Sequence, residues 1–347
     1  MFLTHHPKLR KVLVVSGITL ALFFGALALL ARGPFDTFRG EPRWGVTFSK
    51  PYAQALGIDW RQAYTAMLDD LGVRLIRIPA YWTEIEPERD TFAFDDLDWM
   101  VAEAAQRDAD VLLVVGERVP RWPECHIPEW AGGMQPHIRR AQEREMIREV
   151  VTRYRNNPAI VAWQVENEPF VTFFGTCPEP PDELEFANAI ALVRELDDSR
   201  EIVVTDSGEL STWIRPAKYG DVLGTTMYEV IPRFGNVKYG YSHYLIPSWF
   251  YRKKANLVHR LAPEFDRLII AELQAEPWAG DRFITALTPE EQDRSISLSQ
   301  LKKNIQYARD SKIEEAYLWG VEWWYWTWQE QGRPEFWEAM KQLFSGA

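Results

Sequence analysis

Residues 160–169 read IVAWQVENEP, and this stretch decides the fold more than any other part of the chain. Its first six residues form a short apolar run rich in β-branched and aromatic side chains, which is typical of a strand. Polar residues and a proline follow at once and indicate where the strand ends. The stretch therefore predicts a buried strand with two carboxylates, Glu166 and Glu168, just beyond its carboxyl end.

Runs of the same kind recur on both sides of this stretch. We expect further strands at residues 43–49, 74–79, 110–115, 201–205, 221–227, 267–271 and 316–321. Amphipathic helical patterns lie between them, for example at 60–71, 97–107, 143–154, 184–196 and 298–311. Strands that alternate with helices indicate an α/β protein with a parallel sheet. Eight such units in about 300 residues suit a closed (β/α)8 TIM barrel.

A doubly wound open sheet is the alternative, because the same alternation of strands and helices builds it. Such sheets often bind nucleotides through a glycine-rich turn after the first strand. Here the first strand is followed by Lys50, Pro51 and Tyr52 instead. The barrel is therefore the favoured fold.

The N-terminus carries a long apolar run at residues 12–31, VLVVSGITLALFFGALALLA, which lacks charged side chains. About 20 helical residues cross a hydrocarbon core of about 30 Å. Lys8, Arg10 and Lys11 precede the run, and the positive-inside rule keeps them in the cytoplasm. We expect a cytoplasmic segment (1–11), a transmembrane signal anchor (12–31), a linker (32–42) and an extracytoplasmic barrel (43–347). Secretion after signal cleavage is the alternative, although this run exceeds the usual apolar length of about 7–15 residues.

Composition and charge exclude some classes of function. The formal net charge is −11, which argues against nucleic acid as a partner. The six histidines are scattered without metal-ligand spacing, and no GxSxG serine elbow is present, so no metal or cofactor is expected. The 16 tryptophans fit either a large core or a site where indole faces stack on sugar rings.

Carboxylates follow two of the predicted strands. Glu168 comes shortly after the fourth strand, behind Asn167, and Glu272 directly follows the seventh. Active sites of barrels lie at the carboxyl ends of the strands, so closure can bring these two side chains face to face. Cleavage of a glycosidic bond needs such a pair, one carboxylic acid to protonate the leaving oxygen and one carboxylate to attack or stabilise the sugar.

These residues resemble clan A of the retaining glycoside hydrolases, which includes families 2, 5, 10, 39 and 42. The resemblance covers the whole predicted barrel. It implies that Glu168 is the acid/base, that Glu272 is the nucleophile and that Asn167 binds the sugar 2-hydroxyl group. It also implies that Arg77 lies beside the nucleophile and that Tyr228 hydrogen-bonds to it.

The same resemblance implies that a tryptophan after the eighth strand forms the floor of the sugar site, and Trp319 and Trp323 are the candidates. Family 5 enzymes usually carry a histidine-rich end on strand three and a histidine before the strand-six tyrosine. This chain has residues 116–118 (GER) and 226–228 (TMY) there, which argues against a cellulase-type specificity.

Two neighbouring carboxylates are alternatives for the catalytic roles. Glu166 lies two residues before Glu168, and Glu276 lies four residues after Glu272. The Asn-Glu order favours Glu168, and Glu276, which precedes Pro-Trp, fits a residue that shapes the subsite loop. Among the histidines, His126 and His137 lie in the loop after the third strand, where packing or solvent exposure is expected of both.

The chain has two cysteines, Cys125 and Cys177. They fall in the loops after the third and fourth strands, which neighbour each other at the mouth of a barrel. In an oxidising compartment we predict a disulfide between them. Two free thiols in a cytosolic protein are the alternative.

The sequence thus predicts a retaining glycoside hydrolase that cleaves O-glycosidic bonds, with β bonds expected, of an oligo- or polysaccharide. A membrane-tethered transglycosylase would use the same residues and differ in how water is excluded. A non-catalytic carbohydrate-binding barrel is the third hypothesis, although a binder has no need of a matched acid and nucleophile.

Overall fold

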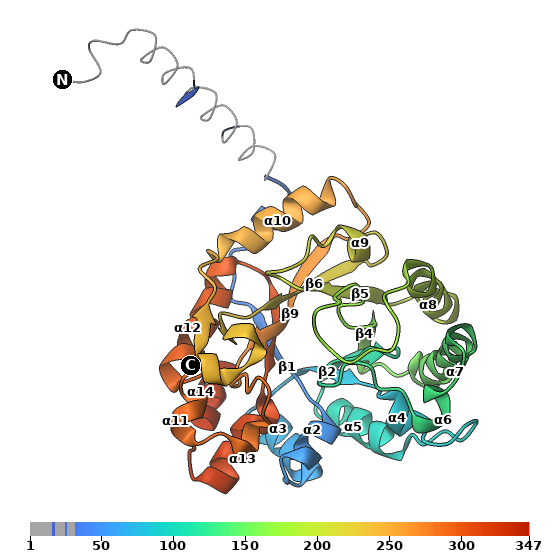
Figure 1. Ribbon diagram of the computed structural model, residues 1–347, viewed down its shortest axis with the longest axis horizontal. Coiled ribbons are helices and arrows are strands. Elements are labelled where there is room, and N and C mark those ends of the chain that lie inside the picture. The colour runs from blue at the N-terminus through green and yellow to red at the C-terminus, as the bar shows by residue number, and fades with distance from the viewer. Residues whose placement is uncertain (1–15, 18–24, 26–31, 347) are drawn as a thin grey trace, which may run out of the picture.

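The computed structural model describes residues 16, 17, 25 and 32–346, in which eight parallel strands close into a barrel inside a ring of helices (Figure 1). The strand order around the barrel is β1-β10-β9-β6-β5-β4-β3-β2. The barrel strands are β1 (Arg43–Thr47), β2 (Leu75–Pro79), β3 (Asp110–Val115), β4 (Ile160–Val165), β5 (Glu201–Asp206), β6 (Val222–Met227), β9 (Arg267–Gln274) and β10 (Glu315–Trp319). This closure confirms the predicted barrel and rules out the open sheet.

Helices follow the strands and cover the outside of the barrel. They are α2 (Lys50–Ala55), α3 (Trp60–Asp69), α4 (Trp82–Ile85), α5 (Asp95–Ala105), α6 (Glu129–Gly132), α7 (Pro136–Tyr154), α8 (Glu183–Leu196), α9 (Ile214–Ala217), α10 (Trp249–His259), α11 (Pro289–Gln292), α12 (Leu298–Ser311), α13 (Val321–Gln331) and α14 (Glu335–Phe344). Helix α7 begins seven residues before its predicted start, at a proline whose missing N–H costs nothing in the first turn.

Side chains that point into the barrel form two layers of opposite character. The lower layer is apolar and consists of Leu75, Leu112, Ala162, Val203, Val222, Ile269 and Tyr317. Two residues further along β2, β4 and β5 the inward positions are polar, namely Arg77, Gln164 and Thr205, and all three are fully buried. Because side chains alternate along a strand, Leu75, Ala162 and Val203 are each followed on the same face by one of these polar residues. The apolar floor thus places a polar layer at the carboxyl ends of the strands.

A hairpin that the sequence analysis did not anticipate follows β6. Strands β7 (Val230–Pro232) and β8 (Tyr241–His243) pair antiparallel and stand apart from the barrel sheet. The side chain of Gln274 at the end of β9 accepts hydrogen bonds from the backbone N–H groups of Glu229 and Val230, at 3.0 and 2.9 Å. The hairpin is therefore fixed to the mouth of the barrel.

The first part of the predicted linker rests on the barrel beside α10. Its short 3-10 helix, η1 (Pro34–Asp36), stacks Phe35 on Phe265 at a centroid distance of 5.2 Å, and Asp36 pairs with Lys253 at 2.7 Å. Within the described part of the chain, no helix is both long and apolar enough to cross a bilayer. The predicted span at residues 12–31 falls almost entirely outside the described residues and stays a prediction.

Candidate active site

Arg77 organises the polar layer at the barrel mouth. This fully buried side chain donates from Nε to Gln164 Oε1 at 2.8 Å and from Nη2 to Asn167 Oδ1 at 2.6 Å. Its Nη1 lies 2.9 Å from Glu272 Oε1. Because the guanidinium is planar and its donors are fixed in direction, one residue of β2 sets the positions of side chains from β4 and β9.

Glu272 is held at both of its oxygens. Arg77 binds Oε1, and the hydroxyl group of Tyr228 donates to Oε2 at 2.9 Å. Tyr228 is itself positioned by Glu209, whose Oε1 accepts a hydrogen bond from the Tyr228 backbone N–H at 2.9 Å. The carboxylate is buried, with 4% of its residue surface exposed, so its orientation is defined by these two donors.

Glu168 faces this group from β4. Its backbone N–H donates to Thr205 Oγ1 at 2.9 Å, and its φ of 44° lies in the left-handed region, which few residues with a side chain adopt. Burial raises the pKa of Glu168 well above its usual range, and the neighbouring charges of Glu272 and Glu124 raise it further. A carboxylic acid that stays protonated beside a carboxylate is the pairing that general acid catalysis requires.

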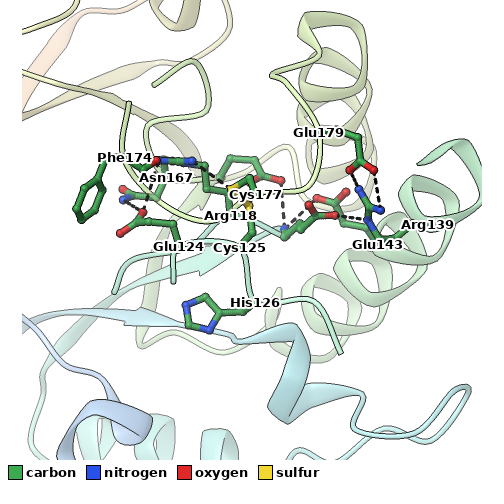
Figure 2. Close-up of a disulfide and its surroundings, with 12 residues drawn as sticks. Arg118, Glu124, Cys125, His126, Arg139, Glu143, Asn167, Phe174, Cys177 and Glu179 are labelled. Carbon is green, nitrogen blue, oxygen red and sulfur yellow. Dashed lines mark hydrogen bonds and ion pairs between the residues drawn. A yellow bond between two sulfur atoms is a disulfide. The ribbon is translucent and has the colours of Figure 1, made fainter. Parts of the chain in front are cut away.

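Glu124 is a third buried carboxyl group at this place, and sequence reasoning missed it. It lies in the β3 loop (residues 116–128) and accepts a hydrogen bond from Asn167 Nδ2 at 3.2 Å (Figure 2). Burial raises its pKa to about 8. Its neighbour Cys125 forms a disulfide with Cys177 of the β4 loop (residues 166–182), as predicted. Glu124 therefore reaches the site from a loop that is covalently tied to the loop carrying Glu168.

Glu166, the alternative acid, points away from the barrel interior. Its carboxylate accepts hydrogen bonds from the backbone N–H groups of Glu117 and Arg118, at 3.2 and 2.7 Å. This approach needs Gly116, whose φ is 132° and where an added Cβ would lie 2.7 Å from the Glu166 carboxyl group. Glu166 also lines a separate cavity of about 290 Å³ that includes residues of α7 and α8. Its role is to join the β3 and β4 loops.

One wall of the mouth is built around Arg121. Its guanidinium lies between two aromatic rings, 3.8 Å from the Tyr52 centroid and 4.1 Å from the Trp319 centroid. It forms ion pairs with Glu276 and with Glu322, the latter at 2.8 Å. Arg121 is 6% exposed, so both ion pairs are shielded from water, and loss of either partner would leave a buried charge unpaired.

Aromatic rings from four loops meet over the other part of the mouth. Trp122 contacts Phe174 at a centroid distance of 5.7 Å, Phe174 contacts Trp278 at 5.7 Å, and Trp278 contacts Tyr228 at 5.2 Å. Trp122 is 65% exposed, whereas the other three are partly buried. These four residues, called here the aromatic arch, form a continuous series of ring contacts from Trp122 to Tyr228, which hydrogen-bonds to Glu272.

The comparisons with known proteins agree with this geometry. Residues 46–318 match the family model described as Cellulase (glycosyl hydrolase family 5). The chain belongs to glycosyl hydrolase family 5. The match spans the strands from β1 to β10, and it shows that the chain is a glycoside hydrolase of clan A.

Solved structures resemble this family 5 member in fold. GH5_18 from Streptomyces cattleya, in complex with GlcNAc, aligns with a TM-score of 0.56 and 13% identity over 82% of this chain and 71% of that one. GH5_18 from Bifidobacterium longum subsp. infantis aligns with a TM-score of 0.54 and 14% identity, over 81% of this chain and 69% of that one. A β-galactosidase from Halorubrum lacusprofundi aligns with a TM-score of 0.50 and 16% identity, over 80% of this chain and 52% of that one. No curated protein matches the chain.

The structure gathers most of the predicted site residues of this family 5 enzyme. Arg77, Asn167, Tyr228 and Glu272 form one connected hydrogen-bond network, and the charge of Glu272 acts on Glu168. Trp319 ends β10 at the same mouth.

Trp323 departs from its prediction. It lies in α13, is fully buried and packs on Phe336 of α14 at a centroid distance of 4.6 Å. This position does not support a contact with substrate. The helix begins at Val321, so Trp323 is already in its first turn, on the face that packs against α14 rather than at the strand end.

His126 is a packing residue in this family 5 enzyme. It is 8% exposed, its ring lies 4.4 Å from the ring of Tyr81, and its Nε2 is 3.0 Å from the Arg121 carbonyl oxygen. Burial lowers its pKa to about 4, so it is neutral at neutral pH. His137, at the start of α7, is exposed.

Arg121 and Glu322 escaped sequence reasoning for different reasons. Arg121 reaches the site from the β3 loop, and no periodic pattern gives the path of a loop. Glu322 directly follows the predicted strand at 316–321, as Glu272 directly follows the predicted strand at 267–271, and the same rule of polar residues at strand ends would have found it.

Proposed function

We propose that the enzyme hydrolyses β-glycosidic bonds with retention of configuration, with Glu168 as the acid/base and Glu272 as the nucleophile. The observation that carries the proposal is the contrast between the two carboxyl groups. Glu272 is bound at one oxygen by Arg77 and at the other by Tyr228, whereas burial and the charge of Glu272 raise the pKa of Glu168. One group is thus suited to attack and the other to donate a proton.

In the first step Glu168 protonates the oxygen of the leaving group, and Glu272 attacks the anomeric carbon to give a covalent glycosyl-enzyme. Arg77 and Tyr228 keep the attacking oxygen in place, because they occupy the carboxylate from two directions. In the second step Glu168, now a carboxylate, takes a proton from water, which displaces Glu272 from the sugar. Asn167 is suited to bind the sugar 2-hydroxyl group, since Arg77, Glu124 and Thr205 fix its amide.

The stereochemistry of the product tests this proposal. Hydrolysis of an aryl β-glycoside is followed by proton NMR during the first minutes, before mutarotation scrambles the anomers. The proposal expects the β-anomer of the free sugar to appear first, and an α-anomer that appears first would show inversion and refute it. Added acceptor sugars in the same assay separate hydrolysis from transglycosylation by their products.

We also propose that the barrel works outside the cytoplasm and is tethered through residues 12–31. The apolar run and the preceding basic residues support a signal anchor. The disulfide between Cys125 and Cys177 supports an oxidising compartment, because disulfides are rare in the cytosol.

A further inference from the structure

We propose that the enzyme is exo-acting and removes single sugars from the non-reducing end of its substrate, because Arg121 closes the glycone side of the barrel mouth. This inference rests on the roles proposed for Glu168 and Glu272. It adds a mode of action to that function and assigns the closure to one residue of the β3 loop.

The position of Glu168 defines the two sides of the mouth. As the acid, it must lie beside the leaving oxygen, so the aglycone leaves on the β4 side. Three barrel strands separate β4 from β10 in either direction, which makes β10 the opposite wall. The glycone therefore extends away from Glu168 and toward Trp319, which ends β10.

Arg121 blocks the path of any longer glycone at that wall. Its guanidinium lies against the Trp319 ring on one side and the Tyr52 ring on the other, so a residue that follows β3 bridges the end of β10 and the segment after β1. Glu276, in the segment after β9, and Glu322, in the first turn of α13, bind the same guanidinium. A second sugar unit beyond the first would have to displace a buried cation from two carboxylates and two rings.

The backbone around Arg121 is fixed in an unusual conformation. Its φ is 86°, a value that costs energy for a residue with a side chain. Its carbonyl oxygen accepts a hydrogen bond from the Glu124 N–H at 2.8 Å and lies 3.0 Å from His126 Nε2. The disulfide at Cys125 then ties this turn to the β4 loop. Such a conformation persists only where surrounding contacts enforce it, which fits a fixed wall rather than a mobile flap.

Burial of the catalytic pair also supports an exo mode of action. Glu168 is 9% exposed and Glu272 is 4% exposed, and the aromatic arch lies over the mouth beside them. An enzyme that cuts a polymer in mid-chain must pass the chain over its carboxyl groups in both directions. A nearly enclosed pair with one closed wall instead admits the end of a chain.

The charges of the wall favour an uncharged sugar. Arg121 is committed to two carboxylates, and Arg77 is committed to Glu272. The charge of each guanidinium is therefore already balanced by carboxylates of the protein. We therefore expect a neutral hexose rather than a uronic acid at the non-reducing end.

One type of substrate tests the mode of action directly. A 4-nitrophenyl β-disaccharide gives two distinguishable first products. An exo cut releases one free monosaccharide and leaves the 4-nitrophenyl monosaccharide, whereas a cut that accepts a two-sugar glycone releases 4-nitrophenol and the free disaccharide. We expect the wild-type enzyme to give the first pair alone on the gluco-, galacto- and manno-configured substrates that it accepts, as resolved by chromatography at low conversion.

Replacement of Arg121 with Ala tests the cause. It should make the free disaccharide and 4-nitrophenol appear among the first products, where the wild type gives neither. Arg89→Ala is the matched control, because Arg89 is exposed in the loop after β2, and it should keep the wild-type products. A folded Arg121→Ala enzyme with unchanged products would overturn the role of Arg121.

The products of the wild-type enzyme test the exo mode of action even if the Arg121→Ala variant does not fold. A free disaccharide as the main first product of the wild type, or faster hydrolysis of a 4-nitrophenyl β-glucuronide than of every neutral glycoside, would overturn the inference and leave the proposed function intact. Hydrolysis with inversion, or no hydrolysis of any glycoside, would instead refute the proposed function itself.

Discussion

Carboxyl groups at the barrel mouth have pKa values that differ from those of carboxyl groups in water. For Glu124 the difference should appear as a pH dependence of the free energy of unfolding. Burial raises its pKa from the ordinary 4.5 to about 8. The folded protein therefore binds this proton more tightly than the unfolded chain does. Binding of this proton stabilises the folded protein. That contribution is complete below pH 4.5 and is lost as the pH rises through about 8.

Replacement of Glu124 with Gln should remove this pH dependence and keep a side chain that can accept from Asn167. Between pH 5 and pH 8 we expect the free energy of unfolding of the wild type to fall more than that of the variant, by a few kcal/mol at most. Denaturant unfolding at both pH values measures it. Glu264→Gln, an exposed site before β9, is the control and should behave as the wild type does. Equal slopes for Glu124→Gln and the wild type would mean that Glu124 is ionised in the folded protein.

The role of Glu168 predicts a dependence on the leaving group. Glu168→Ala should lower kcat/KM about 10²- to 10⁴-fold for an alkyl or sugar aglycone, which must be protonated to leave. It should have much less effect on a 2,4-dinitrophenyl glycoside, whose anion leaves unaided. Steady-state kinetics with both substrates measure the difference. Equal losses for the two would show that Glu168 acts on structure and donates no proton.

The residues of the site divide by how far they lie from a strand end. Glu168 and Glu272 were predictable from the residues alone, because strand ends converge at the mouth of a barrel. Arg77 and Asn167 were predicted from the resemblance to clan A. Glu124 and Arg121 were not, because the β3 loop bends back through two left-handed residues to reach the site. The sequence of the β3 loop does not show which of its charged side chains point into the barrel mouth.

Among the structural elements, the β3 and β4 loops are linked covalently by the disulfide between Cys125 and Cys177. Its sequence separation of 52 residues predicts a stabilisation of roughly 2–4 kcal/mol, which Cys125→Ser with Cys177→Ser should remove. We also expect kcat/KM to fall, since these loops carry Glu124, Arg121 and Glu168. Thermal unfolding and aryl glycoside hydrolysis, each with and without a reductant, measure both effects. The double variant should not respond to reductant, and a wild type that also fails to respond would show that the loops hold their positions without the bond.

The barrel elements follow from hydrophobic periodicity, and the predicted strands agree with the observed ones within a few residues. The β7–β8 hairpin has three-residue strands, too short for any period to be recognised. It forms because Gln274 satisfies the backbone at its base, a tertiary contact that local sequence does not reveal.

At the scale of the whole molecule, the acidic barrel and the basic, apolar N-terminus predict opposite locations for the two ends of the chain. In cells that express the full chain, we expect the protein in the membrane fraction, with the barrel open to added protease only from the non-cytoplasmic side. Deletion of residues 1–31 should leave the barrel in the cytoplasm. Recovery of the full-length chain in the cytoplasmic fraction would contradict the anchor.

Trapping of the glycosyl-enzyme tests directly whether Glu272 is the nucleophile. The enzyme is incubated with 2,4-dinitrophenyl 2-deoxy-2-fluoro-β-glycosides of the gluco, galacto and manno series, and the labelled peptide is identified by mass spectrometry. We predict a single covalent sugar on Glu272, absent from Glu272→Gln and present in the Glu264→Gln control. A label on Glu124, Glu166, Glu168 or Glu276 would contradict it.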